Sequence, residues 1–231
     1  MKKLGMLGGM SYESTAVYYQ LINHEINKQL KSSHSAEIIM YSFDYDELEK
    51  RLEKHLWQEI EDRMVEEAYK LISVGAEGIM LCANTIHQIA PGLEKKISVP
   101  LIHIVKETYK EVKKMNLKKV GLIGTKYTME STMYPSYFNE HGIEVIVPDQ
   151  HDQQVIHDII YKELIIGNFN DESRQKILHI IDHMHVDGII LGCTELPMLI
   201  KKEHLPIHRF DTMEIHAKAA AKWMLSDTYD L

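Results

Sequence analysis

Cys193 is the residue of this chain whose surroundings are best suited to chemistry. It ends a short apolar run, residues 188–192, and Thr194 and Glu195 follow it directly. Thr194 is a good helix cap, and Glu195 suits a helix's first turn. We therefore expect Cys193 at the end of a buried strand and beside a helix N-terminus, which would lower its pKa and favour a thiolate base or nucleophile. The alternative is a small buried hydrophobic residue, the usual role of a free cysteine.

The stretch around Cys193 has a second copy earlier in the chain. Residues 78–85 read GIMLCANT and residues 188–195 read GIILGCTE. When the two are laid glycine on glycine, Ala83 falls opposite Cys193, and Cys82 comes one position early. Successive side chains of an extended chain point to opposite faces, so we expect Cys82 to face away from the site as a buried hydrophobic residue.

A further matching pair extends this internal repeat. Residues 3–8 read KLGMLG and residues 119–124 read KVGLIG. Two copies of a strand–loop–helix unit predict an α/β protein of two pseudo-symmetric, Rossmann-like lobes, each a mainly parallel sheet flanked by helices. Ligands of such sheets bind beyond the carboxyl ends of the strands. We expect the active site in the cleft between the lobes, among four strand-end loops: residues 8–11, 82–85, 124–128 and 193–195.

Hydrophobic patterning predicts the elements that position these loops. Short apolar runs predict strands at residues 3–8, 37–41, 78–81, 101–104, 119–123, 145–147, 188–192 and 207–210. Helical periodicity predicts helices at residues 14–31, 47–54, 58–73, 109–115, 153–166, 172–184 and 213–225, with another starting at Ile86 that Pro91 and Gly92 should break. We expect residues 1–99 and 209–231 in the first lobe and residues 100–208 in the second, since both faces of each sheet need helices.

Composition and charge limit the partners and the compartment. The chain has 231 residues and a net charge of −8, which argues against nucleic-acid and anionic-membrane partners. No apolar run approaches the ~18 residues of a membrane span. Met1 leads within a few residues into a strand, with no signal peptide, and two cysteines make no disulfide framework, so we expect a cytoplasmic protein. The fourteen histidines are spread along the chain and no Cys-x-x-Cys spacing appears, so no metal site is expected.

The loops together resemble those of the aspartate/glutamate racemases, within a larger group that includes hydantoin racemases, glutamate racemases and arylmalonate decarboxylases. The resemblance covers essentially the whole chain. It is closest to the broad-specificity bacterial amino-acid racemases, which have sequences similar to residues 12–15 and 127–130 of this chain. The residues that carry it are Gly8-Gly9-Met10-Ser11, Asn84-Thr85 followed by His87, Gly124-Thr125, and Gly192-Cys193-Thr194-Glu195.

The resemblance implies a cofactor-independent amino-acid racemase of the aspartate/glutamate type, acting on small acidic amino acids or on a broad range of amino acids. In the family's chemistry two cysteines flank the substrate α-carbon. One thiolate removes the α-proton and the opposite thiol delivers a proton to the other face, while donors around the carboxylate stabilise the carbanion. Cys193 would be the acid/base group on one face. A homodimer is expected, and neither pyridoxal phosphate, nucleotide nor metal. The match places the substrate carboxylate and its surroundings at Met10, Ser11, Asn84, Thr85, Thr125, Tyr127, Thr128 and Thr194.

The chain departs from the family at the first cysteine, which is replaced by Ala83. The broad-specificity branch has Thr there, so racemase activity does not require that thiol, and the group on the Ala83 face could be an ordered water or Cys82 after a loop shift. The Arg and Lys with which aspartate-specific members hold the side-chain carboxylate match Glu49 and Ile165, which argues against strict aspartate specificity. The alternatives are a one-cysteine decarboxylase, a one-sided proton-exchange enzyme and a non-catalytic amino-acid-binding protein.

Overall fold

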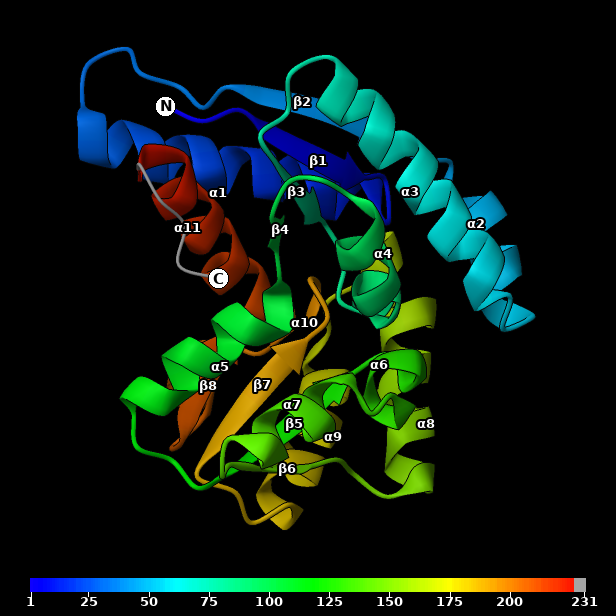
Figure 1. The fold of residues 1–231 in the computed structure, drawn as a ribbon. Coiled ribbons are helices and arrows are strands. Elements are labelled where there is room, and N and C mark those ends of the chain that lie inside the picture. Colours follow the sequence, from blue (N-terminus) through cyan, green and yellow to red (C-terminus); the bar gives the residue numbers. More distant parts are fainter. Residues whose placement is uncertain (227–231) are drawn as a thin grey trace. The chain divides into compact units, whose positions relative to one another are not determined.

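A computed structural model describes residues 1–226 of the chain, which form two compact units (Figure 1). Unit 1 holds Met1–His103 and the segment from His216 onward, and unit 2 holds Ile104–Ile215. The lobes expected from the sequence divide the chain nearby, at residue 99 instead of 103 and at 209 instead of 216. Residues 227–231 of the expected first lobe lie outside the described residues, and the independence of the two lobes stays a prediction.

Unit 1 is built on a four-stranded parallel sheet with the strand order β2-β1-β3-β4. Apolar residues in β1 and β3 are completely buried, as expected of central strands in a parallel sheet. The strands are β1 (Leu4–Gly8), β2 (Ile38–Ser42), β3 (Gly78–Leu81) and β4 (Leu101–Ile102). The helices flanking them are α1 (Tyr12–Leu30), α2 (Tyr45–Glu53), α3 (Trp57–Ser73), the 3₁₀ turn η1 (Thr85–Ile89), α4 (Ala90–Lys96) and α11 (Thr212–Leu225), whose first four residues belong to unit 2.

Unit 2 repeats this design with the strand order β6-β5-β7-β8, again all parallel. Its strands are β5 (Lys119–Gly124), β6 (Glu144–Ile146), β7 (Gly188–Gly192) and β8 (His208–Asp211). Its longer helices are α5 (Ile104–Lys114), α7 (Met133–Glu140), α8 (Gln150–Lys162) and α9 (Asp171–His183). Shorter turns are α6 (Lys126–Glu130), η2 (Leu164–Ile166), α10 (Leu196–Leu199) and η3 (Lys202–His204).

The two sheets confirm the α/β fold class expected from the internal repeat, and they agree in register as well as in order. Leu4 pairs with Gly78 in unit 1, and Val120 pairs with Gly188 in unit 2. These are the pairs that the sequence repeat aligns. Ala83 and Cys193 therefore occupy equivalent positions, each two residues beyond the equivalent leucines of β3 and β7.

Helices α6 and α7 were not expected from the sequence, and α5 and α4 begin at other residues than expected. Helix α5 begins at Ile104, five residues before the expected start, because its buried residues already follow a helical spacing and Thr108 donates a hydrogen bond to the Ile104 carbonyl at 2.8 Å. The helix expected from Ile86 is the 3₁₀ turn η1, which does end before Pro91, at Ile89, but a new helix, α4, begins directly after it. Pro91 lies in the first turn of α4, where its missing N–H costs no hydrogen bond.

The C-terminal helix packs on unit 1 through a close contact at a glycine. A Cβ at Gly78 would overlap the Trp223 ring, so the absence of a side chain there lets α11 approach the sheet. The N-terminus reinforces this contact, since the Lys2 backbone N–H donates to the Met224 carbonyl at 2.8 Å. Within residues 1–226, no helix is both long enough and apolar enough to cross a membrane.

Candidate functional site

The strand-end loops expected to carry function form one pair in each unit. In unit 1, residues 8–11 and 82–87 follow the neighbouring strands β1 and β3, and we call them the first half-site. In unit 2, residues 124–128 and 192–197 follow the neighbouring strands β5 and β7, and we call them the second half-site. The structure thus brings together the predicted residues within each unit.

In the second half-site the Cys193 thiol has a carboxylate partner. Cys193 Sγ donates a hydrogen bond to Glu195 Oε2 at 3.0 Å, and Thr194 Oγ1 donates to the same oxygen at 2.7 Å. Cys193 is 8% exposed, whereas Thr194 and Glu195 are half-buried. Glu195 is therefore a functional candidate to which the sequence reasoning gave no chemical role, although it named the residue in the expected loop and in the family motif. The Cys-x-Glu spacing was the available signal.

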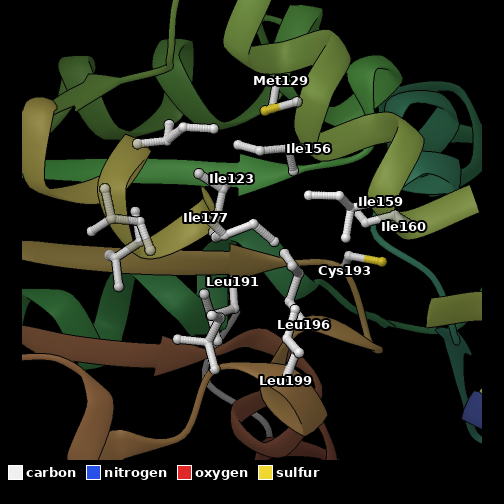
Figure 2. Packing of buried hydrophobic residues seen from close by; sticks show 14 of the residues in the cluster. Ile123, Met129, Ile156, Ile159, Ile160, Ile177, Leu191, Cys193, Leu196 and Leu199 are labelled. Atoms are coloured by element: carbon white, nitrogen blue, oxygen red, sulfur yellow. The ribbon is translucent and has the colours of Figure 1, made fainter. Parts of the chain in front are cut away.

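The pKa of Cys193 is raised well above its ordinary value, contrary to the expected lowering. Burial is the main cause, because Cys193 belongs to an apolar cluster and lies beside Ile159 and Ile160 of α8 (Figure 2). The negative charge of Glu195 and the hydrogen bond to it raise the pKa further. The thiol is therefore protonated at rest.

The helix after Cys193 is too short to reverse this effect. Helix α10 spans only Leu196–Leu199, so few peptide dipoles can add up at its N-terminus. Thr194 is not its cap, contrary to expectation. Glu195 holds the N-cap position without a side-chain capping bond, because its carboxylate accepts from Cys193 and Thr194 instead.

The other loop of the second half-site presents two hydroxyls. Thr125 Oγ1 and Thr128 Oγ1 lie 3.3 Å apart, with Thr128 fully buried and Thr125 half-buried. Gly124 keeps this loop close to the end of β7, since a Cβ there would lie 2.8 Å from the Gly192 carbonyl oxygen. Tyr127 packs edge-on against His157, with ring centroids 6.0 Å apart. Paired hydroxyls in this setting suit a carboxylate group.

In the first half-site the backbone N–H of the glycine turn already has a partner within the chain. Gly9 has a φ of +87°, and a Cβ there would overlap the backbone of Phe43, so this position requires glycine. The Gly9 N–H donates to Thr15 Oγ1 at 2.8 Å. Ser11 caps α1 by accepting the Ser14 N–H at 3.3 Å. Met10 is buried beside it, at 8% exposed.

The second loop of the first half-site contains Ala83 in place of a thiol. Ala83 and Thr85 are half-buried, and Asn84 is 4% exposed. Cys82 is fully buried, and burial raises its pKa, so it has the surroundings of a structural hydrophobic residue. His87 Nδ1 lies 2.7 Å from the Ala83 carbonyl oxygen, and this buried imidazole was not expected from the sequence to hold the loop.

One group of possible metal ligands lies in the described part of the chain, outside both half-sites. It consists of Asp149, His151 and Asp152 at the start of α8. Asp149 already caps the helix by accepting the Asp152 N–H at 2.9 Å, and the group is largely exposed. Helix capping accounts for the Asp149 carboxylate without an ion.

The chain matches a family model and a known relative over most of its length. The family model described as Asp/Glu/Hydantoin racemase matches residues 7–220. The Broad specificity amino-acid racemase RacX of Bacillus subtilis (strain 168) is 27% identical over 237 residues, which cover 96% of this chain and 98% of that protein. These matches confirm the resemblance to the aspartate/glutamate racemases that the loop motifs suggested.

Solved structures share the fold over its whole length. The crystal structure of a candidate Asp/Glu racemase from Yersinia pestis is 41% identical with a TM-score of 0.92, and the match covers 98% of this chain and 100% of that one. An aspartate racemase homologue from Pyrococcus horikoshii OT3 is 32% identical with a TM-score of 0.84, over 98% and 100% of the two chains.

Proposed function

Because this chain belongs to the Asp/Glu/hydantoin racemase family of isomerases, we propose that it is a cofactor-independent amino-acid racemase that uses Cys193 for α-proton transfer. The observation that carries this proposal is the hydrogen bond from the Cys193 thiol to Glu195. A thiol with a high pKa becomes a strong base only when a neighbouring group takes its proton. Glu195 is placed to take it.

The proposed reaction begins with proton transfer from Cys193 to the Glu195 carboxylate. The resulting thiolate removes the substrate α-proton, which restores the thiol and leaves a carbanion conjugated with the substrate carboxylate. The proposal assigns stabilisation of the negative charge on that carboxylate to hydroxyl donors such as Thr125 and Thr128, whose oxygens lie 3.3 Å apart. A water molecule gives a proton to the opposite face and becomes hydroxide, and that hydroxide takes the proton held by Glu195, which restores the starting thiol and carboxylate.

The group that serves the opposite face is proposed to be a water molecule. Ala83, the repeat equivalent of Cys193, has no proton to give. Cys82 is fully buried with a raised pKa, so its use would require movement of the loop. A water-mediated step is less well oriented than a fixed thiol, so we expect proton exchange on one face to outrun inversion.

The substrate range is proposed to favour amino acids without an acidic side chain. Glu49 and Ile165 stand at the positions matched to the cations of aspartate-specific racemases. Glu49 on α2 is half-buried, and burial, followed by the charges of Glu53 and Asp46, raises the pKa of its carboxyl. Ile165 packs against the apolar cluster of unit 2. Neither residue offers a positive charge to a second carboxylate.

A homodimer is also proposed. It is supported by the edge strand β2, which has a neighbour on one side only within the sheet of unit 1 and exposes 48% of Met40. Exposed strand edges are common sites of chain pairing. Light scattering coupled to size-exclusion chromatography should give twice the chain mass, and Met40→Lys should shift the protein toward the monomer. A monomeric wild-type protein would contradict this proposal.

The activity is tested with single enantiomers of neutral, basic and acidic amino acids in D₂O. Chiral chromatography measures inversion and NMR measures α-deuteration in the same sample. Cys193→Ser should abolish both, whereas Cys82→Ser is the matched control that should retain both. Activity should survive dialysis against EDTA and treatment with a carbonyl reagent. Release of CO₂ without inversion would instead identify a decarboxylase, and tight binding without exchange would identify a binding protein.

A further inference from the structure

Behind Ala83, unit 1 contains a buried group of three histidines and a tyrosine. His87 and His216 are fully buried, and His103 is 8% exposed. The His87 ring centroid lies 5.1 Å from that of His103 and 5.4 Å from that of His216. Tyr18 Oη lies 3.3 Å from His216 Nδ1. The proposed mechanism gives none of these imidazoles a role.

The hydrogen-bond partners determine where each imidazole carries its proton. His216 Nε2 lies 2.7 Å from the Ile102 carbonyl oxygen, so Nε2 carries the hydrogen and Nδ1 accepts from the Tyr18 hydroxyl. His87 Nδ1 lies 2.7 Å from the Ala83 carbonyl oxygen, so we assign the hydrogen of this ring to Nδ1, and the Ile102 carbonyl also acts on the ring. Burial lowers the pKa of His87 and of His216 to about 3, so both rings are neutral at ordinary pH. His87 is therefore a fixed donor and not an acid.

His87 holds the loop at two successive carbonyl groups. Its side chain donates to the Ala83 carbonyl, and its backbone N–H donates to the Asn84 carbonyl at 2.9 Å. The peptide planes on both sides of Asn84 are thereby oriented by one residue. The direction of the Asn84 and Thr85 side chains, which we assign to the substrate carboxylate, depends on those planes.

The second copy of the repeat fastens its loop in a different way. The residue equivalent to His87 is Pro197, which has no donor, and the residue equivalent to Thr85 is Glu195. There the carboxylate of Glu195 binds Cys193 and Thr194 directly. The second half-site thus holds its loop with a hydrogen-bond acceptor, the Glu195 carboxylate. The first half-site holds its loop with a hydrogen-bond donor, the His87 imidazole.

We propose that His87 is a positioning residue of the racemase, and that its Nδ1–H bond to the Ala83 carbonyl sets the Asn84–Thr85 loop for substrate binding. This inference rests on the proposed function. The His216 ring packs against the His87 ring, and Tyr18 is hydrogen-bonded to His216, so these two residues keep the His87 ring in one orientation. His87 does not touch the substrate and transfers no proton.

The test compares two amide replacements that differ in where they place an N–H. His87→Asn puts an amide nitrogen near the position of Nδ1, and His87→Gln puts it near Nε2. His87→Asn should keep kcat and KM within about threefold of wild type. His87→Gln should raise KM for the amino acid roughly tenfold with little change in kcat, because a buried carbonyl without its donor is costly. The matched control is His141→Gln, since His141 Nδ1 also bonds a carbonyl four residues earlier, that of Tyr137, at 2.7 Å on an exposed helix end.

Two readouts that need no turnover separate this inference from the proposed function. Nitrogen-15 NMR of the ring should show His87 protonated at Nδ1 and unchanged between pH 5.5 and 9. Hydrogen exchange of the backbone amides of residues 83–87 should be about tenfold faster in His87→Gln and unchanged in His87→Asn. If the wild type lacks turnover but both readouts hold, the proposed function fails, and what stands is that His87 orders the 83–87 loop. Equal behaviour of the two variants, an Nε2–H tautomer, or a ring that titrates near pH 6.5 would overturn the inference.

Discussion

Cys193 donates its thiol hydrogen to Glu195 at 3.0 Å, and the two residues lie on either side of Thr194 at the end of β7. This contact makes Cys193 a protonated thiol with an attached proton acceptor. It differs from a thiolate stabilised at the N-terminus of a long helix, because here both burial and the neighbouring charge favour the neutral form. The contact therefore sets the expected effects of alkylating Cys193 and of replacing Glu195.

Replacement of Glu195 by Gln should separate the reactivity of Cys193 from its catalytic use. Loss of the negative charge lowers the pKa of Cys193, so iodoacetamide should react faster at pH 8 than with the wild type. Racemisation should fall by roughly 10²-fold, because the thiol loses the acceptor for its proton. Thr194→Val is the matched control, since it removes the second hydrogen bond to Glu195 and keeps the charge. Wild-type labelling with a midpoint below about pH 8.5, the unperturbed thiol value, would contradict the raised pKa.

Replacement of Ala83 by Cys should supply the proton-transfer group that the first half-site lacks. General acid–base help is worth roughly 10²–10⁴-fold in rate, and Ala83→Cys should recover part of that factor in racemisation. The wild type should exchange the α-proton of one enantiomer faster than it inverts it, and the variant should bring the two rates closer. Deuterium incorporation and chiral chromatography measure both. If exchange and inversion keep pace in the wild type and the variant gains nothing, the second base lies elsewhere.

The stability of the protein should fall as the pH is lowered below about 6.5. The pKa values of His87 and His216 are lowered to about 3 in the folded chain, so the unfolded chain binds protons that the folded chain does not. Each such histidine removes about 1.4 kcal/mol of unfolding free energy per pH unit in this window. His216→Gln can still donate to the Ile102 carbonyl but does not titrate, so its stability should depend less on pH. Urea unfolding at pH 7.5 and pH 5 tests this, and an equal pH dependence in the two proteins would refute it.

The contact between Gly78 and Trp223 should make even a methyl group costly. Gly78→Ala places a Cβ inside the space of the indole, so the helix or the strand must shift, at about 1–3 kcal/mol. Thermal unfolding should show a lower midpoint. Gly142→Asn is the control, because a side chain there meets no atom within 4 Å and Asn tolerates the positive φ of this position. An unchanged midpoint in Gly78→Ala would show that α11 is not packed as described.

The internal repeat could be recognised in the sequence because buried parallel strands have a characteristic local pattern of residues. Buried strands need continuous apolar residues, and each is followed by a turn of small and polar residues, so the strand–loop units at residues 78–85 and 188–195 could be aligned directly. That alignment placed Ala83 opposite Cys193, and the strand registers agree with it. Helix boundaries at Ile104 and Pro91 were less visible, since a strand end and a helix start can share the same apolar residues.

What only the tertiary structure decided was the environment of the chemical groups. The spacing of Cys193 and the turn after it predicted a lowered pKa, but the burial contributed by α8 and the turn of Glu195 toward the thiol raise it. Likewise, Tyr18, His87 and His216 are far apart in the chain and meet only when α1, η1 and α11 pack together. A residue's type is local information. Its pKa and its hydrogen-bond partner depend on desolvation and on neighbours that distant segments supply.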